Sequence, residues 1–213
     1  MLRLPTEDTM ALLKTIARDD FVAIVDKKLK GGAVAVASLD LDHFAALNTT
    51  HGQEAGNLAL ASLERTLTGS LPHGALLHRL GGDEYAVALP DHSAESALIV
   101  FEEIRSHCSA HPFSPDLPSA RLTVSVGIAS RPPHATATAE LLRAADEALG
   151  RAKREGRSRV AIYVEEKMTL KSNYYSRANL DRLAKLSSHT SRTEASLLRE
   201  ALDDLLAKFR DQL

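Results

Sequence analysis

A glycine pair followed by two acids, Gly81-Gly82-Asp83-Glu84-Tyr85, stands near the middle of the chain. Two adjacent glycines favour a tight turn that other residues make at a cost, and without Cβ atoms they let a backbone approach a phosphate closely. The carboxylates that follow are the hard oxygen donors that divalent cations prefer. Apolar residues 75–77 and 85–89 flank the stretch, so we predict a β-hairpin with the acids at its tip. A plain hairpin with solvated acids is the simpler alternative.

Composition limits the classes of protein that fit. With 213 residues, 44% hydrophobic and 25% charged, the chain is expected to form one large or two smaller globular domains. The longest apolar run, residues 33–39, is too short to span a bilayer, and residues 1–8 lack the apolar core of a signal peptide. A single cysteine, Cys108, excludes an intrachain disulfide and a multi-cysteine metal site. We therefore expect a cytoplasmic protein without a membrane partner.

Charge is distributed unevenly along the chain. Residues 167–213 contain 9 Lys and Arg against 6 Asp and Glu, whereas residues 1–166 contain 17 against 22. This asymmetry predicts two domains, at residues 1–164 and 168–213, joined by a short linker at residues 165–167. Most of the excess basic charge lies in the first half of the second domain, which suits a surface that meets phosphates.

Strands and helices alternate through the first domain. Strand patterns cover residues 33–39, 122–129 and 160–164, and helical patterns cover residues 56–67, 93–104 and 138–156. Thr138 is predicted to cap the last helix and Gly156 to end it. The first strand would deliver Asp40 and Asp42 to one side if it continues that far. This order favours an α+β, ferredoxin-like architecture.

Several motifs occur together in this domain. They are Asp40-Leu41-Asp42-His43-Phe44 with Asn48, Gly52 and Gly56, then Gly81 to Tyr85, Thr123 to Gly127, Ala145 to Leu149, and Ala152 to Arg157. Over most of residues 30–164 they resemble the GGDEF domain of diguanylate cyclases. The resemblance implies a nucleotide-cyclase-type fold that condenses two GTP molecules to cyclic di-GMP, with two Mg²⁺ or Mn²⁺ ions per active site.

The resemblance also implies a role for each matching residue. Asp40, Asp83 and the main-chain carbonyl of Leu41 would bind the two cations, and Glu84 would bind metal or activate the ribose hydroxyl. Cations so placed can polarise the α-phosphate and lower the pKa of the attacking hydroxyl. Lys153 and Arg157, four residues apart, are expected on one edge of a helix, where a solvated helix end is the simpler alternative. The expected nucleotide-binding residues are His43, Phe44, Asn48, Asn57, Gly81, Gly82, Lys153 and Arg157.

Some positions depart from the family pattern. Residues 8–21 lack the acid-hydroxyl-leucine-threonine motif of the family, which leaves the N-terminal helix and its part in dimer contacts open. Ala45 and Thr49 replace a lysine and an aspartate. Pro72 and Ala75 stand where an Arg-x-x-Asp product-inhibition site would lie, so we expect that site to be absent.

Two further departures change polar groups. Tyr85 replaces the family's phenylalanine. Asn57 occupies the position of an aspartate that accepts two hydrogen bonds from guanine. An amide offers one acceptor and one donor, so it cannot accept both bonds, and it complements the edge of adenine instead. We keep GTP as the expected substrate because Asn48 also matches a guanine-reading position, and we expect reduced selectivity for the base.

The tail has a different pattern. Residues 168–174 alternate as a strand, and two amphipathic helices follow, the second with Thr193 as its cap. About 45 residues cannot bury such faces alone, so a homodimer, or a higher oligomer built from it, is expected. The pattern resembles ribbon-helix-helix DNA-binding domains, in which paired strands enter the major groove. The residues that would contact double-stranded DNA are Thr169, Lys171, Asn173, Arg192 and Thr193.

Three functions remain open at this point. The chain could be an active cyclase that also regulates transcription, with nucleotide state coupled to DNA binding. It could be a transcription regulator whose weak or inactive cyclase domain senses nucleotide or cyclic di-GMP. It could also be a cyclase that its tail only dimerises. A ribbon register with Ser172 and Tyr174 outward, and a tail that binds protein instead of DNA, stay open as well.

Overall fold

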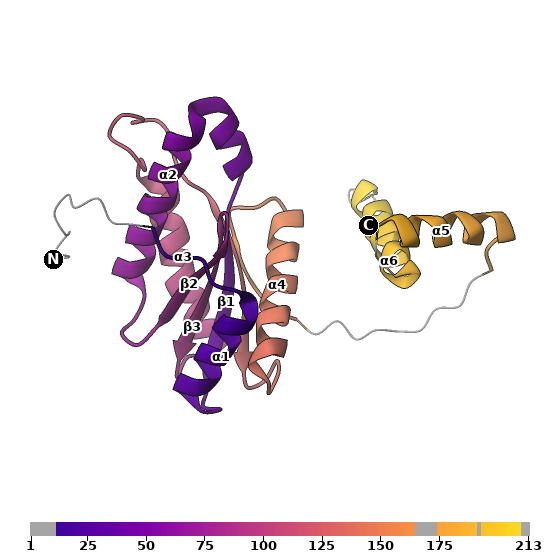
Figure 1. Cartoon of the computed structure of the whole chain (residues 1–213), viewed down its shortest axis with the longest axis horizontal. Helices are drawn as coiled ribbons and strands as arrows, with labels where there is room; N and C mark the ends of the chain where they lie inside the picture. The colour runs from indigo at the N-terminus through magenta and orange to yellow at the C-terminus, as the bar shows by residue number, and fades with distance from the viewer. Residues whose placement is uncertain (1–11, 165–173, 191–192, 210–213) are drawn as a thin grey trace. The chain divides into compact units, whose positions relative to one another are not determined.

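The chain divides into two compact units, residues 1–166 and 167–213. The computed structural model describes residues 12–164, 174–190 and 193–209 (Figure 1). In chain order the first unit contains α1 (Arg18–Leu29), β1 (Val34–Leu41), α2 (Phe44–Ser70), β2 (Leu76–Gly81), β3 (Glu84–Pro90), α3 (Ala94–Ala110), β4 (Val124–Arg131), α4 (Thr138–Arg154) and β5 (Val160–Ile162).

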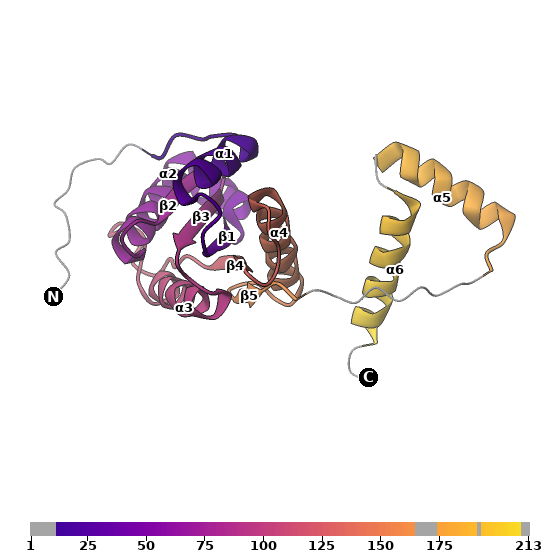
Figure 2. The same cartoon turned by 90° about the horizontal axis from the view of Figure 1, so that it is seen from below.

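The first unit is built on a mixed five-stranded sheet. Its strand order is β2-β3-β1-β4-β5, with β4 and β5 parallel and the other neighbours antiparallel. Helices α2 and α3 cover one face, and α1 and α4 cover the other (Figure 2). The central strand β1 is therefore buried along its whole length, which explains its unbroken apolar pattern. This arrangement confirms the predicted α+β class.

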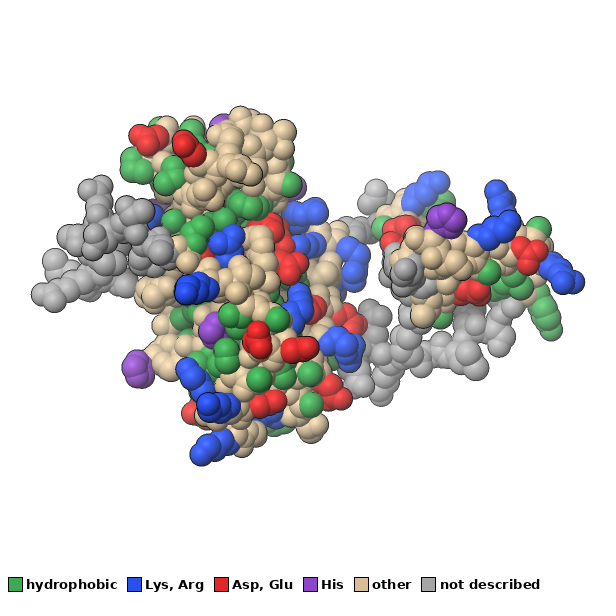
Figure 3. All heavy atoms as spheres, viewed as in Figure 1, with side chains coloured by type: hydrophobic (Ala, Val, Ile, Leu, Met, Phe, Trp, Pro, Cys, Tyr) green, Lys and Arg blue, Asp and Glu red, His purple; other side chains and the backbone are tan. Residues whose placement is uncertain are grey.

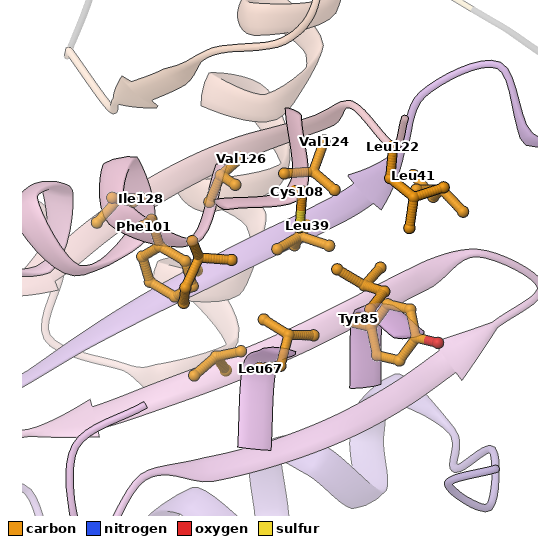
Figure 4. Close-up of a cluster of buried hydrophobic side chains, with 14 of the residues drawn as sticks. Leu39, Leu41, Leu67, Tyr85, Phe101, Cys108, Leu122, Val124, Val126 and Ile128 are labelled. Atoms are coloured by element: carbon orange, nitrogen blue, oxygen red, sulfur yellow. The ribbon is translucent and has the colours of Figure 1, made fainter. Parts of the chain in front are cut away.

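The larger core cluster lies between the sheet and helices α2 and α3. Leu39 and Leu41 of β1 pack there with Phe101 of α3 (Figure 4). The ring of Tyr85, from β3, belongs to the same cluster and is 1% exposed. Strands β2 and β3 form a hairpin around Gly81–Glu84, which we call the signature hairpin. Tyr85, directly after the two acids, anchors this hairpin in the core.

Some predicted boundaries are wrong. The helix expected at residues 56–67 is longer, because α2 begins at Phe44 and bends at Gly52, whose φ is 84°. The strand expected at residues 122–129 is shifted to Val124–Arg131. The N-terminal helix, whose construction the sequence left open, is α1, and its buried Phe21 and Val25 belong to the core.

The ends of α4 differ in how well they were predicted. Ala137, not Thr138, is the N-cap. The Thr138 hydroxyl instead donates to the Oδ1 atom of Asp26 in α1 at 2.5 Å, which links the two helices. Gly156 has φ 119° two residues after Arg154, and confirms the predicted end of the helix.

The second unit contains α5 (Arg177–Thr190) and α6 (Glu194–Lys208). Thr193 immediately precedes α6, and its carbonyl accepts a hydrogen bond from the Leu197 N–H at 3.1 Å. Hydrophobic side chains are visible on the surface of this unit (Figure 3). The predicted strand lies outside the described residues except for Tyr174, and so do Thr169, Lys171, Asn173 and Arg192. Among the helices that the structure describes, none combines the length and apolar character needed to span a membrane.

Candidate functional site

The signature hairpin lies directly against the end of β1. Asp40 and Glu84 are register partners on the two antiparallel strands. The Leu41 N–H donates to the main-chain carbonyl of Asp83 at 3.3 Å. The sheet therefore brings Asp40 and Leu41 together with Asp83 and Glu84, a pair that lies about 40 positions further along the sequence.

Asp40 is the most buried of these acids. It is 7% exposed, and its Oδ2 atom lies 2.7 Å from the Nζ atom of Lys153. Burial raises the pKa of Asp40, the ion pair with Lys153 opposes that rise, and the neighbouring carboxylates of Asp83 and Asp42 add to it. The acids thus repel one another at close range, and a bound cation would relieve that repulsion.

The donor set fits a divalent cation that is shared with a substrate. Among the described residues, no cluster of three or more His, Cys, Asp or Glu side chains is arranged as a metal site. Asp40 and Asp83 supply two carboxylates, and Leu41 can supply a carbonyl. Mg²⁺ is usually held by one or two carboxylates, water and substrate phosphates, not by an all-protein cage. The residues therefore suit a cation that arrives with a nucleotide.

Asp42 has a different task from Asp40. It is 8% exposed and lies just after the end of β1. Its Oδ1 atom accepts from the Ser125 hydroxyl at 2.7 Å, and its Oδ2 atom accepts from the Ser158 N–H at 2.9 Å. Asp42 therefore ties the loop after α4 to β4, and this loop carries Arg157.

The structure corrects the expected placement of Lys153 and Arg157. Helix α4 ends at Arg154, so only Lys153 is helical. Arg157 lies in the loop, with φ 63°, and its N–H donates to the carbonyl of Ala152 at 3.0 Å. The two positively charged side chains therefore come from different elements, Lys153 from the helix and Arg157 from the loop. The bond from the Arg157 N–H to Ala152 keeps the exposed Arg157 side chain next to the end of the helix.

The bend in α2 brings Asn48, one of the two asparagines expected to meet the base, against Gly56. A Cβ atom on Gly56 would lie 1.9 Å from the Oδ1 atom of Asn48 and 3.2 Å from the Phe44 ring. Asn48 therefore packs against Gly56, which is the neighbour of Asn57. Any larger residue at position 56 would displace the Asn48 amide from this contact. His43 is the N-cap of α2 and adopts a left-handed conformation, with φ 60°.

The signature glycines do not make the turn in the way the sequence suggested. Neither Gly81 nor Gly82 has a positive φ, and an added Cβ would meet nothing within 4 Å at either position. The fold therefore does not require glycine here. The side chain of Arg79 stabilises the turn instead, because its Nε atom donates to the Gly82 carbonyl at 2.9 Å.

A crevice of about 260 Å³ lies beside the first turns of α2. It shares Leu41 and His43 with the predicted site, but the acids Asp40, Asp83 and Glu84 are not in its wall. The other residues that line it are Asp42, Ala46, Leu47, Thr50, His51, Arg121, Leu122 and Thr123.

Arg18 is a site residue that the sequence did not reveal. Its Nη2 atom lies 3.3 Å from the Oε2 atom of Glu84, and its Nη1 atom pairs with Asp146 of α4. Arg18 and Glu84 are 66 positions apart, so no local spacing could have indicated the contact. The only signal in the sequence was the position of its other partner, Asp146, inside the Ala145–Leu149 motif.

Comparison with known proteins identifies the first unit. The family model described as "Diguanylate cyclase, GGDEF domain" matches residues 18–159. The chain is 36% identical over 125 residues to the "Probable diguanylate cyclase DgcC" of Escherichia coli, a match that covers 58% of this chain and 33% of DgcC. The chain thus corresponds to about a third of the length of that relative.

Solved structures give the same result. The GGDEF domain of PA1120 (TpbB or YfiN) from Pseudomonas aeruginosa superposes with a TM-score of 0.66 at 30% identity, covering 75% of this chain and 95% of that domain. The GGDEF domain of DgcB from Caulobacter crescentus, solved in complex with c-di-GMP, superposes with a TM-score of 0.63 at 26% identity, covering 75% and 99%. The chain belongs to the diguanylate cyclase GGDEF domain family.

Proposed function

We propose that the first unit condenses two GTP molecules to cyclic di-GMP with Mg²⁺ as its divalent cation. The observation that carries this proposal is the convergence at the end of β1. There the hairpin that bears Asp83 and Glu84 is bonded to Leu41, beside the Asp40 carboxylate and the Lys153 ammonium. Carboxylates that can hold metal ions, with an ammonium group nearby for the phosphates, are groups that phosphoryl transfer from a nucleotide uses.

Each residue has a distinct part in this proposal. Asp40 and Asp83 would hold cations that polarise the α-phosphate and lower the pKa of the attacking 3′-hydroxyl. Glu84 would accept the proton of that hydroxyl while the new P–O bond forms and pyrophosphate leaves. Lys153 would exchange its partner Asp40 for a phosphate oxygen, and Arg157 would bind the same phosphates.

Turnover by the purified chain tests the proposal. With GTP and either MgCl₂ or MnCl₂, we expect cyclic di-GMP and pyrophosphate, both quantified by chromatography. Asp83→Ala should lower the rate by about 100-fold or more, because it removes a group that acts in the transition state. Glu103→Ala, which changes an exposed acid on α3, is the matched control and should be unaffected. A folded wild-type chain that makes no cyclic di-GMP with either metal would contradict the proposal.

The second unit is proposed as a dimerisation domain of the ribbon-helix-helix type. The observation that favours it is the surface of its helices, because no residue of α5 is buried and several large apolar residues are exposed. Pairing with a second copy would cover these side chains and raise the effective concentration of the two cyclase domains. The exposed residues are Leu180, Leu186, Leu198, Leu202, Leu205, Leu206 and Phe209.

Sedimentation of the full chain tests dimerisation. We expect a dimer for the wild type and a monomer for Leu202→Asp, which places a charge on the proposed interface. Ile99→Asp is the matched control, because Ile99 is similarly exposed, 63% against 54%, but lies on α3. Equal behaviour of the two variants would contradict a tail-mediated dimer.

The same unit is proposed to bind double-stranded DNA, with nucleotide state coupled to DNA affinity. A pool of random-sequence duplexes can supply a preferred site, whose affinity is then measured by fluorescence anisotropy at fixed salt. Lys171→Ala should weaken binding of this site. Under the proposed coupling, GTP with Mg²⁺ should change the affinity for DNA, and so should cyclic di-GMP. DNA affinity that neither nucleotide changes would contradict the coupling.

A further inference from the structure

A short segment that ends at the first residue of α1, Leu13–Arg18, contacts both strands of the signature hairpin, and we call it the N-terminal brace. Thr15 forms an isolated parallel bridge with Arg79 of β2, and the Ile16 N–H donates to the Arg79 carbonyl at 3.0 Å. Arg79 in turn supports the turn through its bond to the Gly82 carbonyl. The brace thus reaches the first strand of the hairpin through main-chain contacts.

A buried carboxylate links the brace to the second strand. Glu64 of α2 is 1% exposed, and it accepts from the Tyr85 hydroxyl and from the Leu13 N–H, each at 2.8 Å. Burial raises the pKa of Tyr85, and its bond to Glu64 raises it further, so this hydroxyl remains a donor. An unpaired carboxylate is costly in the core, so Glu64 holds both donors in place.

Arg18, at the start of α1, completes the set. Its guanidinium lies between Glu84 of the hairpin and Asp146 of α4. Asp146 also accepts from the Ser38 hydroxyl of β1 at 2.6 Å, so it is itself fixed to the sheet. The Arg18 and Glu84 side chains are 46% and 49% exposed, and ion pairs this exposed add little to stability. We therefore expect Arg18 to affect the orientation of the Glu84 carboxylate more than the stability of the fold.

We propose that Arg18 is a positioning residue that fixes the Glu84 carboxylate for the reaction, and that the N-terminal brace fixes the hairpin on which Glu84 stands. This inference rests on the proposed cyclase function, in which Glu84 acts on the 3′-hydroxyl. The physical reason is geometric, because a displacement of about 1 Å in a reacting group can cost about 100-fold in rate. Arg18 restricts the side chain, while Ile16 and Glu64 restrict the two strands that carry it.

Two readouts on the full chain test the proposal. Arg18→Gln should lower kcat about tenfold and leave KM for GTP within about twofold, because the ground-state contacts of the nucleotide are intact. Arg18→Lys, which keeps the charge, should recover part of the loss. Hydrogen exchange of residues 79–86 should become faster in Ile16→Pro, which removes the N–H donor to the Arg79 carbonyl, and remain unchanged in β4. Arg105→Gln breaks an ion pair with Glu102 on α3 and is the matched control for both readouts.

The outcomes separate this inference from the proposed function. A wild-type chain without cyclase activity contradicts the proposed function, but hydrogen exchange then still tests the brace. Unchanged exchange of residues 79–86 in Ile16→Pro overturns the part of the inference that concerns the brace, whatever the activity. In an active enzyme, unchanged kcat in Arg18→Gln, or an equal loss in Arg105→Gln, also overturns it.

Discussion

The hydroxyl of Tyr85 makes a hydrogen bond that a phenylalanine ring cannot make. The family has phenylalanine at this position, and here the added oxygen donates to the buried carboxylate of Glu64 at 2.8 Å. The hydroxyl and the carboxylate depend on each other, because neither a buried tyrosine hydroxyl nor a buried carboxylate is stable without a partner.

We therefore expect Tyr85→Phe to destabilise the protein even though it restores the family residue. The free energy of unfolding, measured with urea, should fall by about 1–3 kcal/mol, because one oxygen of Glu64 loses its donor. In a Glu64→Gln background the same substitution should cost less, because an amide oxygen is a weaker acceptor than a carboxylate. An equal cost in both backgrounds would show that the bond contributes nothing.

Asn57 carries the prediction about the base. Its side chain is exposed on α2, and the preceding residue, Gly56, lies against Asn48 across the bend at Gly52. Asn57→Asp supplies the second acceptor that guanine requires and should raise the ratio of kcat/KM for GTP over ATP by about tenfold. Competing titrations of the two nucleotides measure that ratio. A wild-type chain that already discriminates as strongly as Asn57→Asp would rule out relaxed selectivity.

At the scale of secondary-structure elements, the close packing of α4 on β4 depends on one glycine. A Cβ atom on Gly127 would lie 2.1 Å from the carbonyl oxygen of Ala145 and 2.1 Å from the nitrogen of Leu149. Both are main-chain atoms of a helix, so they cannot move aside singly. The contact fixes the distance between helix and sheet, and thereby the position of Lys153 one turn further along α4.

Gly127→Ala should therefore be strongly destabilising. We expect a loss of about 3 kcal/mol or more in the free energy of unfolding, since the whole helix must shift. Gly81→Ala is the matched control, because its Cβ would meet nothing within 4 Å, and it should change stability by less than about 0.5 kcal/mol. Similar urea midpoints for the two variants would contradict this account.

The extent of α2 also belongs to this scale. The apolar spacing predicted a helix only from Gly56, because the bend at Gly52 interrupts the periodicity that the first turns share with the rest. The first turns are half-exposed or exposed, so their pattern carries little information. These turns contain Phe44 and Asn48, and only the tertiary structure shows that both residues lie against Gly56 and belong to the same helix.

At the scale of the whole molecule, two histidines make stability depend on pH. Burial lowers the pKa of both His78 and His134 from the ordinary value of 6.5. The unfolded chain then binds protons before the folded chain does, as the pH falls below 6.5. The stability that the neutral rings contribute is complete above pH 6.5 and is lost towards the folded-state pKa.

His134→Asn should reduce this pH dependence. An asparagine can keep an acceptor for the Ser130 N–H, which lies 3.0 Å from His134 Nδ1, but it does not titrate. The fall in Tm between pH 7.5 and pH 5.5 should be smaller than in the wild type. His51→Asn, at an exposed position, is the control and should leave that fall unchanged. A fall that His134→Asn does not alter would show that His134 is not responsible.

The sequence by itself determined the family, the α+β class and the identity of the signature acids. These features are local, because they depend on residue types at short spacings and on apolar periodicity, both of which can be read along the chain. The tertiary structure decided which groups meet. It paired Lys153 with Asp40, assigned Asp42 to the loop before β5, and brought Arg18 to Glu84 across 66 positions. Such contacts depend on strand register and helix packing, which no local spacing encodes.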